Sequence, residues 1–87
     1  MDVTVRFFAA ARAASGIEKL TITLPNGGTL AELIDTLTSD DGPGNHSELE
    51  RVLARSSYLC NEIATTERTR QLPQGSTIDV LPPFAGG

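Results

Sequence analysis

The sequence predicts a single α+β domain, in which a mixed β-sheet has one main helix laid across one face. Three observations support this class. Residues near both ends of the chain alternate between apolar and polar, one strong helical pattern lies between them, and 87 residues provide for one hydrophobic core. Hydrophobic residues make up 39% of the chain and charged residues 21%, which is typical of a globular domain.

The N-terminal part of the chain predicts a strand, a short helix and a second strand. Residues 2–8 alternate, and the strand they predict has an inward apolar face of Val3, Val5 and Phe7. The alanine-rich residues 9–15 favour a helix, which Gly16 ends. Residues 20–24 alternate again, before the turn "PNGG", and predict a second strand with an inward face of Leu20, Ile22 and Leu24.

The strongest helical pattern follows at residues 29–39. Its apolar residues recur at the spacing of one helix face: Leu30, Leu33, Ile34 and Leu37. Residues 40–46 ("DDGPGNH") predict a loop, and a shorter helix follows with the apolar residues Leu49, Val52 and Leu53. Two residue pairs have the spacing of a helix N-cap: Thr29 with Glu32, and Ser47 with Glu50.

The C-terminal part predicts two more strands. Residues 57–61 ("SYLCN") contain strand-forming residues, whereas the polar residues 62–71 support no assignment. After the turn "LPQG", residues 76–81 alternate and predict the last strand. Its inward face carries Ile78 and Val80, and its solvated face carries Thr77, Asp79 and Leu81.

This order of elements fits a ubiquitin-like β-grasp, in which the first and last strands are parallel neighbours at the centre of the sheet. Parallel neighbours finish at the same edge of a sheet. We therefore predict a β-grasp domain at residues 1–81 and an extended tail at residues 82–87, which leaves the domain beside the end of the first strand.

The charge of the chain excludes some classes of partner. The formal net charge is −4, from seven basic and eleven acidic residues, and no basic residues cluster along the sequence. This balance disfavours binding to nucleic acid or to an anionic membrane. No apolar run approaches the ~20 residues of a membrane helix, and the N-terminus has no signal-peptide pattern. The single cysteine excludes an internal disulfide, and we expect a cytoplasmic protein.

The reactive side chains do not predict a self-contained active site. Cys60 has no basic neighbour in the sequence to stabilise a thiolate, and we interpret it as structural rather than nucleophilic. We interpret His46 as an isolated, solvated side chain in a loop. One Cys and one His cannot form a structural zinc site, and no glycine loop for phosphate is present. We therefore predict no metal site and no bound cofactor.

Two apolar residues break the strand patterns. Phe8 and Leu81 lie on the faces predicted to be solvated, each at the C-terminal end of its strand. If the two strands are parallel neighbours, these side chains are close together beside the tail, and an exposed apolar patch there indicates a partner-binding surface. The alternative is that the helix at residues 9–15 folds over Phe8 and buries it.

The C-terminus, "LPPFAGG", is apolar and ends in two glycines. Prolines keep the chain extended, six residues can reach roughly 20 Å, and glycines can pass through a channel too narrow for other residues. A frayed terminus would explain the glycines but neither the prolines nor an exposed Phe84. We interpret the segment as a functional tail, formed by Pro82, Pro83, Phe84, Ala85 and Gly86, that can be inserted into a narrow channel and that ends in the bare carboxylate of Gly87.

The opening "VRFFAAARAASG" and the ending "LPQGSTIDVLPPFAGG" resemble the small subunits of molybdopterin synthase, within the MoaD/ThiS family of ubiquitin-like sulfur carriers. The resemblance covers essentially the whole chain. It implies that an ATP-dependent adenylating enzyme, similar to ubiquitin-activating enzymes, activates the Gly87 carboxylate, and that persulfide sulfur then converts it to a thiocarboxylate. The tail would enter the large synthase subunit and donate this sulfur to a pterin precursor of the molybdenum cofactor. The chain would thus be the sulfur-donating subunit of a sulfurtransferase.

By position, the resemblance implies that Phe8, Arg12 and Leu81 bind both the activating enzyme and the large subunit. Ala64 matches a position that can hold a larger aliphatic residue in the family. Two alternatives stay open. One is a related carrier that supplies thiazole, cysteine or tRNA thiolation, and the other is a ubiquitin-like binding module with no chemistry at its terminus.

Overall fold

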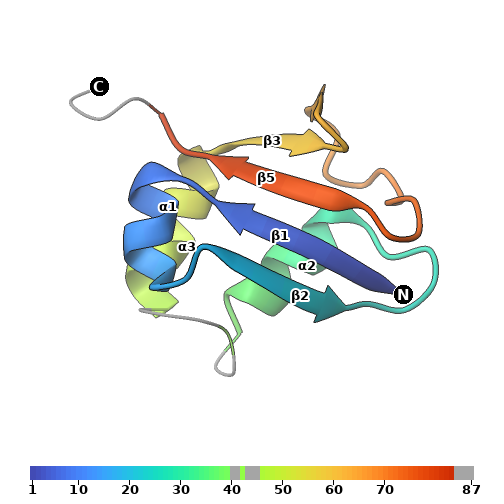
Figure 1. Cartoon of the computed structure of the whole chain (residues 1–87), viewed down its shortest axis with the longest axis horizontal. Helices are drawn as coiled ribbons and strands as arrows, with labels where there is room; N and C mark the ends of the chain where they lie inside the picture. The colour runs from blue at the N-terminus through green and yellow to red at the C-terminus, as the bar shows by residue number, and fades with distance from the viewer. Residues whose placement is uncertain (40–41, 43–45, 84–87) are drawn as a thin grey trace.

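The computed structural model describes residues 1–39, 42 and 46–83, which form a five-stranded sheet and three helices (Figure 1). The strands are β1 (Asp2–Phe7), β2 (Lys19–Thr23), β3 (Ser57–Cys60), β4 (Ile63–Thr65) and β5 (Thr77–Leu81). The helices are α1 (Ala9–Ser15), α2 (Leu30–Leu37) and α3 (His46–Arg55). The strand order in the sheet is β2-β1-β5-β3-β4.

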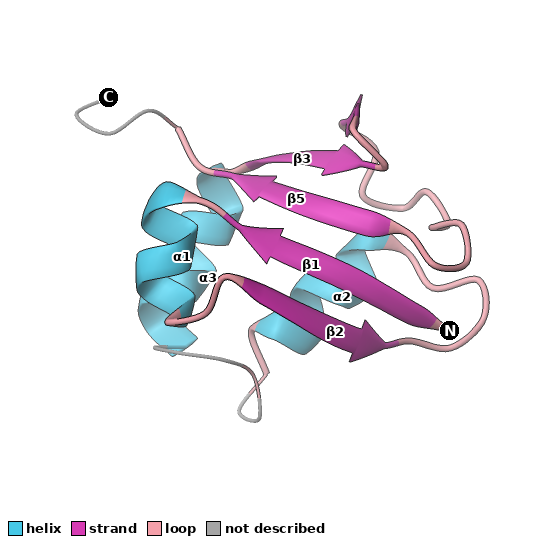
Figure 2. Ribbon diagram, in the orientation of Figure 1, coloured by secondary structure: helices cyan, strands magenta, loops and turns pink. Residues whose placement is uncertain are grey.

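The predicted topology is confirmed, because β1 and β5 are parallel neighbours at the centre of the sheet. All other pairings are antiparallel. Figure 2 shows that β1 and β5 end at the same edge, beside α1, and that α2 crosses behind the sheet. The fold is therefore the β-grasp predicted above. The division into a domain at residues 1–81 and a tail at residues 82–87 stays a prediction, because residues 84–87 lie outside the described part of the chain.

The helices cover one face of the sheet and enclose the core there. The alternation in β1 is confirmed, since its three inward residues are at most 1% exposed. Buried leucines reach this core from both longer helices: Leu30, Leu33 and Leu37 of α2, and Leu49 and Leu53 of α3. No helix among the described residues is both long and apolar enough to cross a membrane.

The helix starts were predicted with mixed success. At α2 the Thr29 Oγ1 accepts the Glu32 N–H at 3.2 Å, as predicted for an N-cap. The predicted N-cap of α3 at Ser47 is wrong, because this helix begins at His46 and Ser47 lies inside its first turn. With ten residues, α3 is also longer than the eight-residue α2. Packing of the apolar face of α3 against the core and α1 outweighs the local capping preference.

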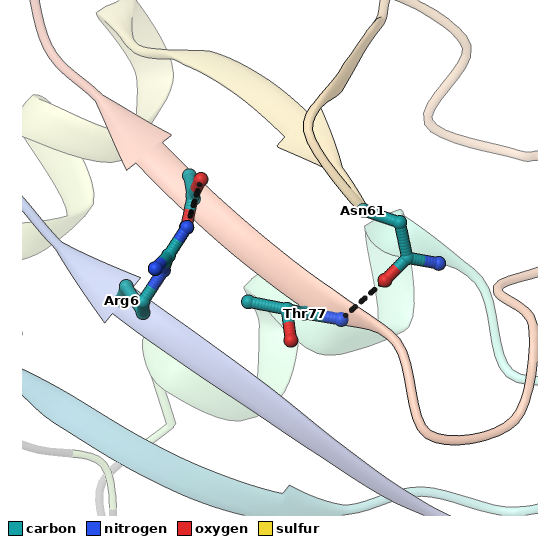
Figure 3. Close-up of polar contacts among 4 residues, drawn as sticks. Arg6, Asn61 and Thr77 are labelled. Carbon is teal, nitrogen blue, oxygen red and sulfur yellow. Dashed lines mark hydrogen bonds and ion pairs between the residues drawn. The ribbon is translucent and has the colours of Figure 1, made fainter.

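The polar stretch that supported no assignment contains β4, which pairs with β3 as a hairpin. The two residues between these strands, Asn61 and Glu62, have φ values of 50° and 71°. Positive φ at both central residues is the feature of a type I′ turn, which favours Asn-Gly. The Asn61 side chain also accepts the Thr77 N–H at 2.9 Å, which joins this turn to the start of β5 (Figure 3).

Replacing Glu62 by glycine is expected to stabilise the protein by roughly 0.5–1 kcal/mol, because glycine adopts positive φ without strain. Chemical denaturation of the two proteins measures this difference. Asn61→Gly is the matched control: it relaxes the same turn but removes the acceptor of the Thr77 N–H, so it should give no gain. Equal stabilities of Glu62→Gly and the original protein would contradict the assigned turn.

Tyr58, the single tyrosine, links β3 to the end of α3 and to the loop after β4. Its hydroxyl donates to the Leu53 carbonyl at 2.7 Å, and the Arg68 guanidinium lies 5.3 Å from the ring centroid. Only 4% of this residue is exposed. Burial raises the pKa of Tyr58 to about 12, although the nearby Arg68 cation opposes the shift.

We expect this tyrosine to make folding sensitive to alkaline pH. Its pKa is higher in the folded than in the unfolded chain, so its contribution is fully present below pH 10 and is lost as the pH rises toward 12. The loss should be about 2–3 kcal/mol. Denaturation curves across this range measure the effect, and Tyr58→Phe should remove the pH-dependent part. If the stability of the Tyr58→Phe protein falls equally steeply at alkaline pH, other groups cause the pH dependence.

Candidate functional site

The face of the sheet opposite the helices, called the outer face here, has an ion pair at its centre. Arg6 Nε lies 2.5 Å from Asp79 Oδ1, and Arg6 Nη2 lies 2.7 Å from Oδ2 (Figure 3). The strand register places these two residues directly opposite each other on β1 and β5. The hydrogen bonds and charge of Asp79 raise the pKa of Arg6 above its ordinary value. Two forked hydrogen bonds give this pair a defined geometry.

The prediction that Asp79 faces solvent was wrong, because only 4% of this residue is exposed. Its side chain points to the outer face as expected, but the Arg6 guanidinium lies against it. The carboxylate therefore reaches the outer face already neutralised. A partner can cover this centre without burying an unpaired negative charge.

Phe8 lies just beyond the end of β1 and is 40% exposed. It is the N-cap residue of α1, with extended φ and ψ of −121° and 152°, and the next residue, Ala9, has a φ of 48°. Because the residue is 40% exposed, the alternative in which α1 folds over the Phe8 ring and buries it is wrong. The Arg6 guanidinium lies 5.9 Å from the ring centroid, on the outer face.

Leu81 is the last residue of β5, the strand beside β1, and lies next to the Phe8 ring. Phe7 is the register partner of Val80, so one further step along both strands brings Phe8 and Leu81 side by side. Leu81 is half-buried rather than exposed. The third predicted partner-binding residue, Arg12, is exposed on α1, with Nη2 3.5 Å from Glu18 Oε2. The partner-binding roles of these three residues stay predictions.

Sequence reasoning missed Leu59, which the register places on the outer face opposite Asp79 and Ala64. Leu59 is half-buried and Ala64 is exposed. The signal was present in the alternation of "SYLC", where Tyr58 and Cys60 pack toward the core. With Leu59 pointing outward, the apolar surface extends from β1 across β5 to β3.

The remaining candidates are placed as follows. Pro82 is half-buried and Pro83 is exposed directly after β5, whereas Phe84, Ala85, Gly86 and Gly87 lie outside the described residues. Cys60 is half-buried and packs against the core, as expected of a structural residue. His46, predicted in a loop, is the first residue of α3. In the described ranges, no three or more His, Cys, Asp or Glu side chains are grouped to hold a metal ion.

The fold and these features define a ubiquitin-like β-grasp protein whose last strand leads into a Gly-Gly terminus. The ThiS family model matches residues 5–87, so the chain belongs to the ThiS family. It is a sulfur carrier of the MoaD/ThiS type. No curated protein matches the sequence significantly.

Three solved structures illustrate the similarity. SAMP1 from Haloferax volcanii has a TM-score of 0.80 at 21% identity, with all of both chains covered. A putative molybdopterin converting factor subunit 1 from Pyrococcus furiosus has a TM-score of 0.78 at 22% identity, covering 95% of this chain and 98% of that one. A chain of the complex of subunits 1 and 2 of molybdopterin-converting factor from Helicobacter pylori has a TM-score of 0.69 at 28% identity, with full coverage of both chains.

Proposed function

We propose that this protein is the small subunit of molybdopterin synthase, which carries sulfur as a thiocarboxylate on Gly87 and donates it to a pterin precursor of the molybdenum cofactor. The observation that carries the proposal is the common edge at which β1 and β5 end. This edge brings exposed Phe8 and half-buried Leu81 to the point where the chain continues into its Gly-Gly segment. The proposed docking surface and the proposed reactive terminus are therefore separated by only a few residues of sequence.

The chemistry starts from a carboxylate, which is a poor electrophile. An ATP-dependent activating enzyme transfers AMP to the Gly87 carboxylate and releases pyrophosphate, which gives the acyl carbon a good leaving group. A persulfide attacks this carbon and AMP leaves, and a thiol then reduces the sulfur–sulfur bond to release the thiocarboxylate. The thiocarboxylate is ionised and nucleophilic at neutral pH. This chain supplies the carboxylate and the docking surface, while its partners supply the active sites.

The outer face supports both docking steps. Its centre is a neutralised ion pair, and apolar Phe8, Leu59 and Leu81 lie around it. Such a face combines apolar area with a fixed polar centre, as protein interfaces do. Successive docking of the activating enzyme and the large subunit on one face ensures that only one of them holds the tail at a time. All three proteins would act in the cytoplasm, where ATP is available.

A related carrier function is the second candidate, and the similarity to SAMP1 favours it. Two measurements separate the candidates. Mass spectrometry of the protein with its native terminus, after incubation with activating enzyme, ATP and a sulfur source, should show exchange of one oxygen for sulfur. Reconstitution with the large synthase subunit of the same organism should then convert the pterin precursor. Thiocarboxylate without pterin product would identify a carrier for another pathway. If neither thiocarboxylate nor pterin product formed, the protein would be a ubiquitin-like binding module.

A further inference from the structure

One long edge of the sheet is formed by β2, which pairs only with β1 in the described part of the chain (Figure 1). The Leu24 N–H donates to the Met1 carbonyl, and the Phe7 N–H donates to the Glu18 carbonyl. In an antiparallel pair every second residue is bonded to the neighbouring strand, so the even-numbered residues of β2 are bonded to β1. The N–H and C=O groups of the odd-numbered residues therefore point to the free edge: Lys19, Thr21 and Thr23.

This edge lacks most of the features that prevent a strand from pairing with another chain. Edge strands are commonly protected by a proline, a bulge or several charges. β2 contains no proline, and its five residues, KLTIT, are in unbroken register with β1. Three of the five are β-branched and favour an extended backbone. Its one charged residue, Lys19, stands at its start. The strand therefore presents a regular row of backbone donors and acceptors.

A second copy of β2 fits this edge best in one antiparallel register. If Thr21 lies opposite Thr21 of the second copy, Lys19 lies opposite Thr23 of that copy. Every outward N–H and C=O group of both strands then has a partner. A shift by two residues in either direction leaves one end residue of each strand without a partner. The favoured register has a two-fold axis through Thr21, perpendicular to the sheet.

The side chains of the two copies are complementary in this register. Leu20 and Ile22 are half-buried against the core, and each lies opposite the other across the axis, so both become more buried. On the outer face, Lys19 approaches Asp2 of the second copy. Asp2 is the register partner of Thr23 and accepts a hydrogen bond from Thr23 Oγ1 at 2.8 Å, so it leans toward the edge. Two such contacts of opposite charge offset part of the repulsion between two chains of net charge −4.

We propose that β2 pairs with β2 of a second copy, which forms a reversible two-fold dimer with one continuous sheet. The inference does not depend on the proposed function. The axis places the two outer faces on the same side, and the two β5 strands run in opposite directions with β1 and β2 of each copy between them. The ends of β1 and β5 are therefore outside the contact, and the dimer presents two separate tails. Because the contact is one strand wide, we expect a dissociation constant between about 1 µM and 1 mM.

Charge at Thr21 tests the dimer, because this residue meets its own copy on the axis. Thr21→Lys and Thr21→Glu should each weaken self-association at least about tenfold, since like charges then lie directly opposite each other. An equimolar mixture of these two variants should associate again, since opposite charges then face each other. The matched controls are Thr66→Lys and Thr66→Glu, the same changes at an exposed threonine just after β4, at the other end of the sheet. Sedimentation equilibrium up to about 1 mM protein measures all of them.

A disulfide tests the register. Residues directly opposite in a bonded antiparallel pair have Cα atoms about 5.5 Å apart, which suits a disulfide. In a protein that also carries Cys60→Ser, Thr21→Cys should therefore form a covalent dimer under mild oxidation. Thr23→Cys is the matched control: it lies on the same edge and face, but opposite Lys19 of the second copy, so it should remain monomeric on a non-reducing gel. Thermal melts show whether each variant is folded.

Self-association that each Thr21 charge variant loses alone and the mixture regains, together with the selective disulfide, supports the inference. An original protein that stays monomeric up to about 1 mM overturns it. A dimer that the Thr21 charge variants leave unchanged, or equal crosslinking of Thr23→Cys and Thr21→Cys, assigns the contact to another surface or register and also overturns it. None of these results affects the proposed function, which is tested by sulfur loading and pterin formation.

Discussion

Deleting Gly87, or adding one residue after it, is expected to abolish thiocarboxylate formation completely while the protein melts at an unchanged temperature. The reactive group is the terminal carboxylate itself. A peptide bond at this position leaves no oxygen that can accept AMP, and a deletion shortens the reach of the tail by about 3.3 Å. Among the described residues, the buried hydrophobic core runs from Val3 to Val80, so we expect neither change to destabilise it.

The measurement is intact-protein mass spectrometry after incubation with the activating enzyme, ATP and a sulfur source. A removable extension provides the matched control, because proteolytic cleavage back to Gly87 should restore the full sulfur load in the same sample. Thermal melts before and after cleavage should coincide. Thiocarboxylate on an extended chain that had not been cleaved would refute the proposed chemistry.

Phe8→Ala is expected to weaken partner binding about thirtyfold while changing stability by less than about 1 kcal/mol. An aromatic anchor at an interface is commonly worth ~2 kcal/mol or more, which corresponds to that ratio. Phe8 is 40% exposed and lies outside the core cluster, so its truncation leaves no enclosed cavity. A buried phenylalanine would instead cost about 3–5 kcal/mol.

Val5→Ala is the matched control, since Val5 lies on the same strand with its side chain on the opposite, fully buried face. It should lower stability by about 2 kcal/mol and affect binding only through that loss. Leu81→Ala should combine both effects, because Leu81 is half-buried beside Phe8. Thermal melts and a binding titration on the three variants decide between these roles. Normal binding by a folded Phe8→Ala protein would remove Phe8 from the docking surface.

The sequence by itself determined the central strands, the main helix and the capped start of that helix. Alternation of apolar residues in β1 and β5 is a local pattern, and a strand can bury only one of its two faces, so the inward residues could be assigned directly. The Thr29 cap and the Gly16 stop depend on neighbours within a few residues. The same local patterns identified Phe8 and Leu81 as exceptions at strand ends.

Only the tertiary structure determined which polar residues of the outer face contact one another. Asp79 is buried because Arg6, far away in the sequence, lies opposite it in the sheet register. The pairing of β4 depends on a turn with strained backbone angles that the residue types did not indicate. Arg6, Arg12 and Lys19 come from β1, α1 and β2 and line one cavity where β1 ends, although no basic residues cluster along the chain. The energy between two charges depends on the distance between them in space. Here that distance is set by strand register, which a short stretch of sequence does not determine.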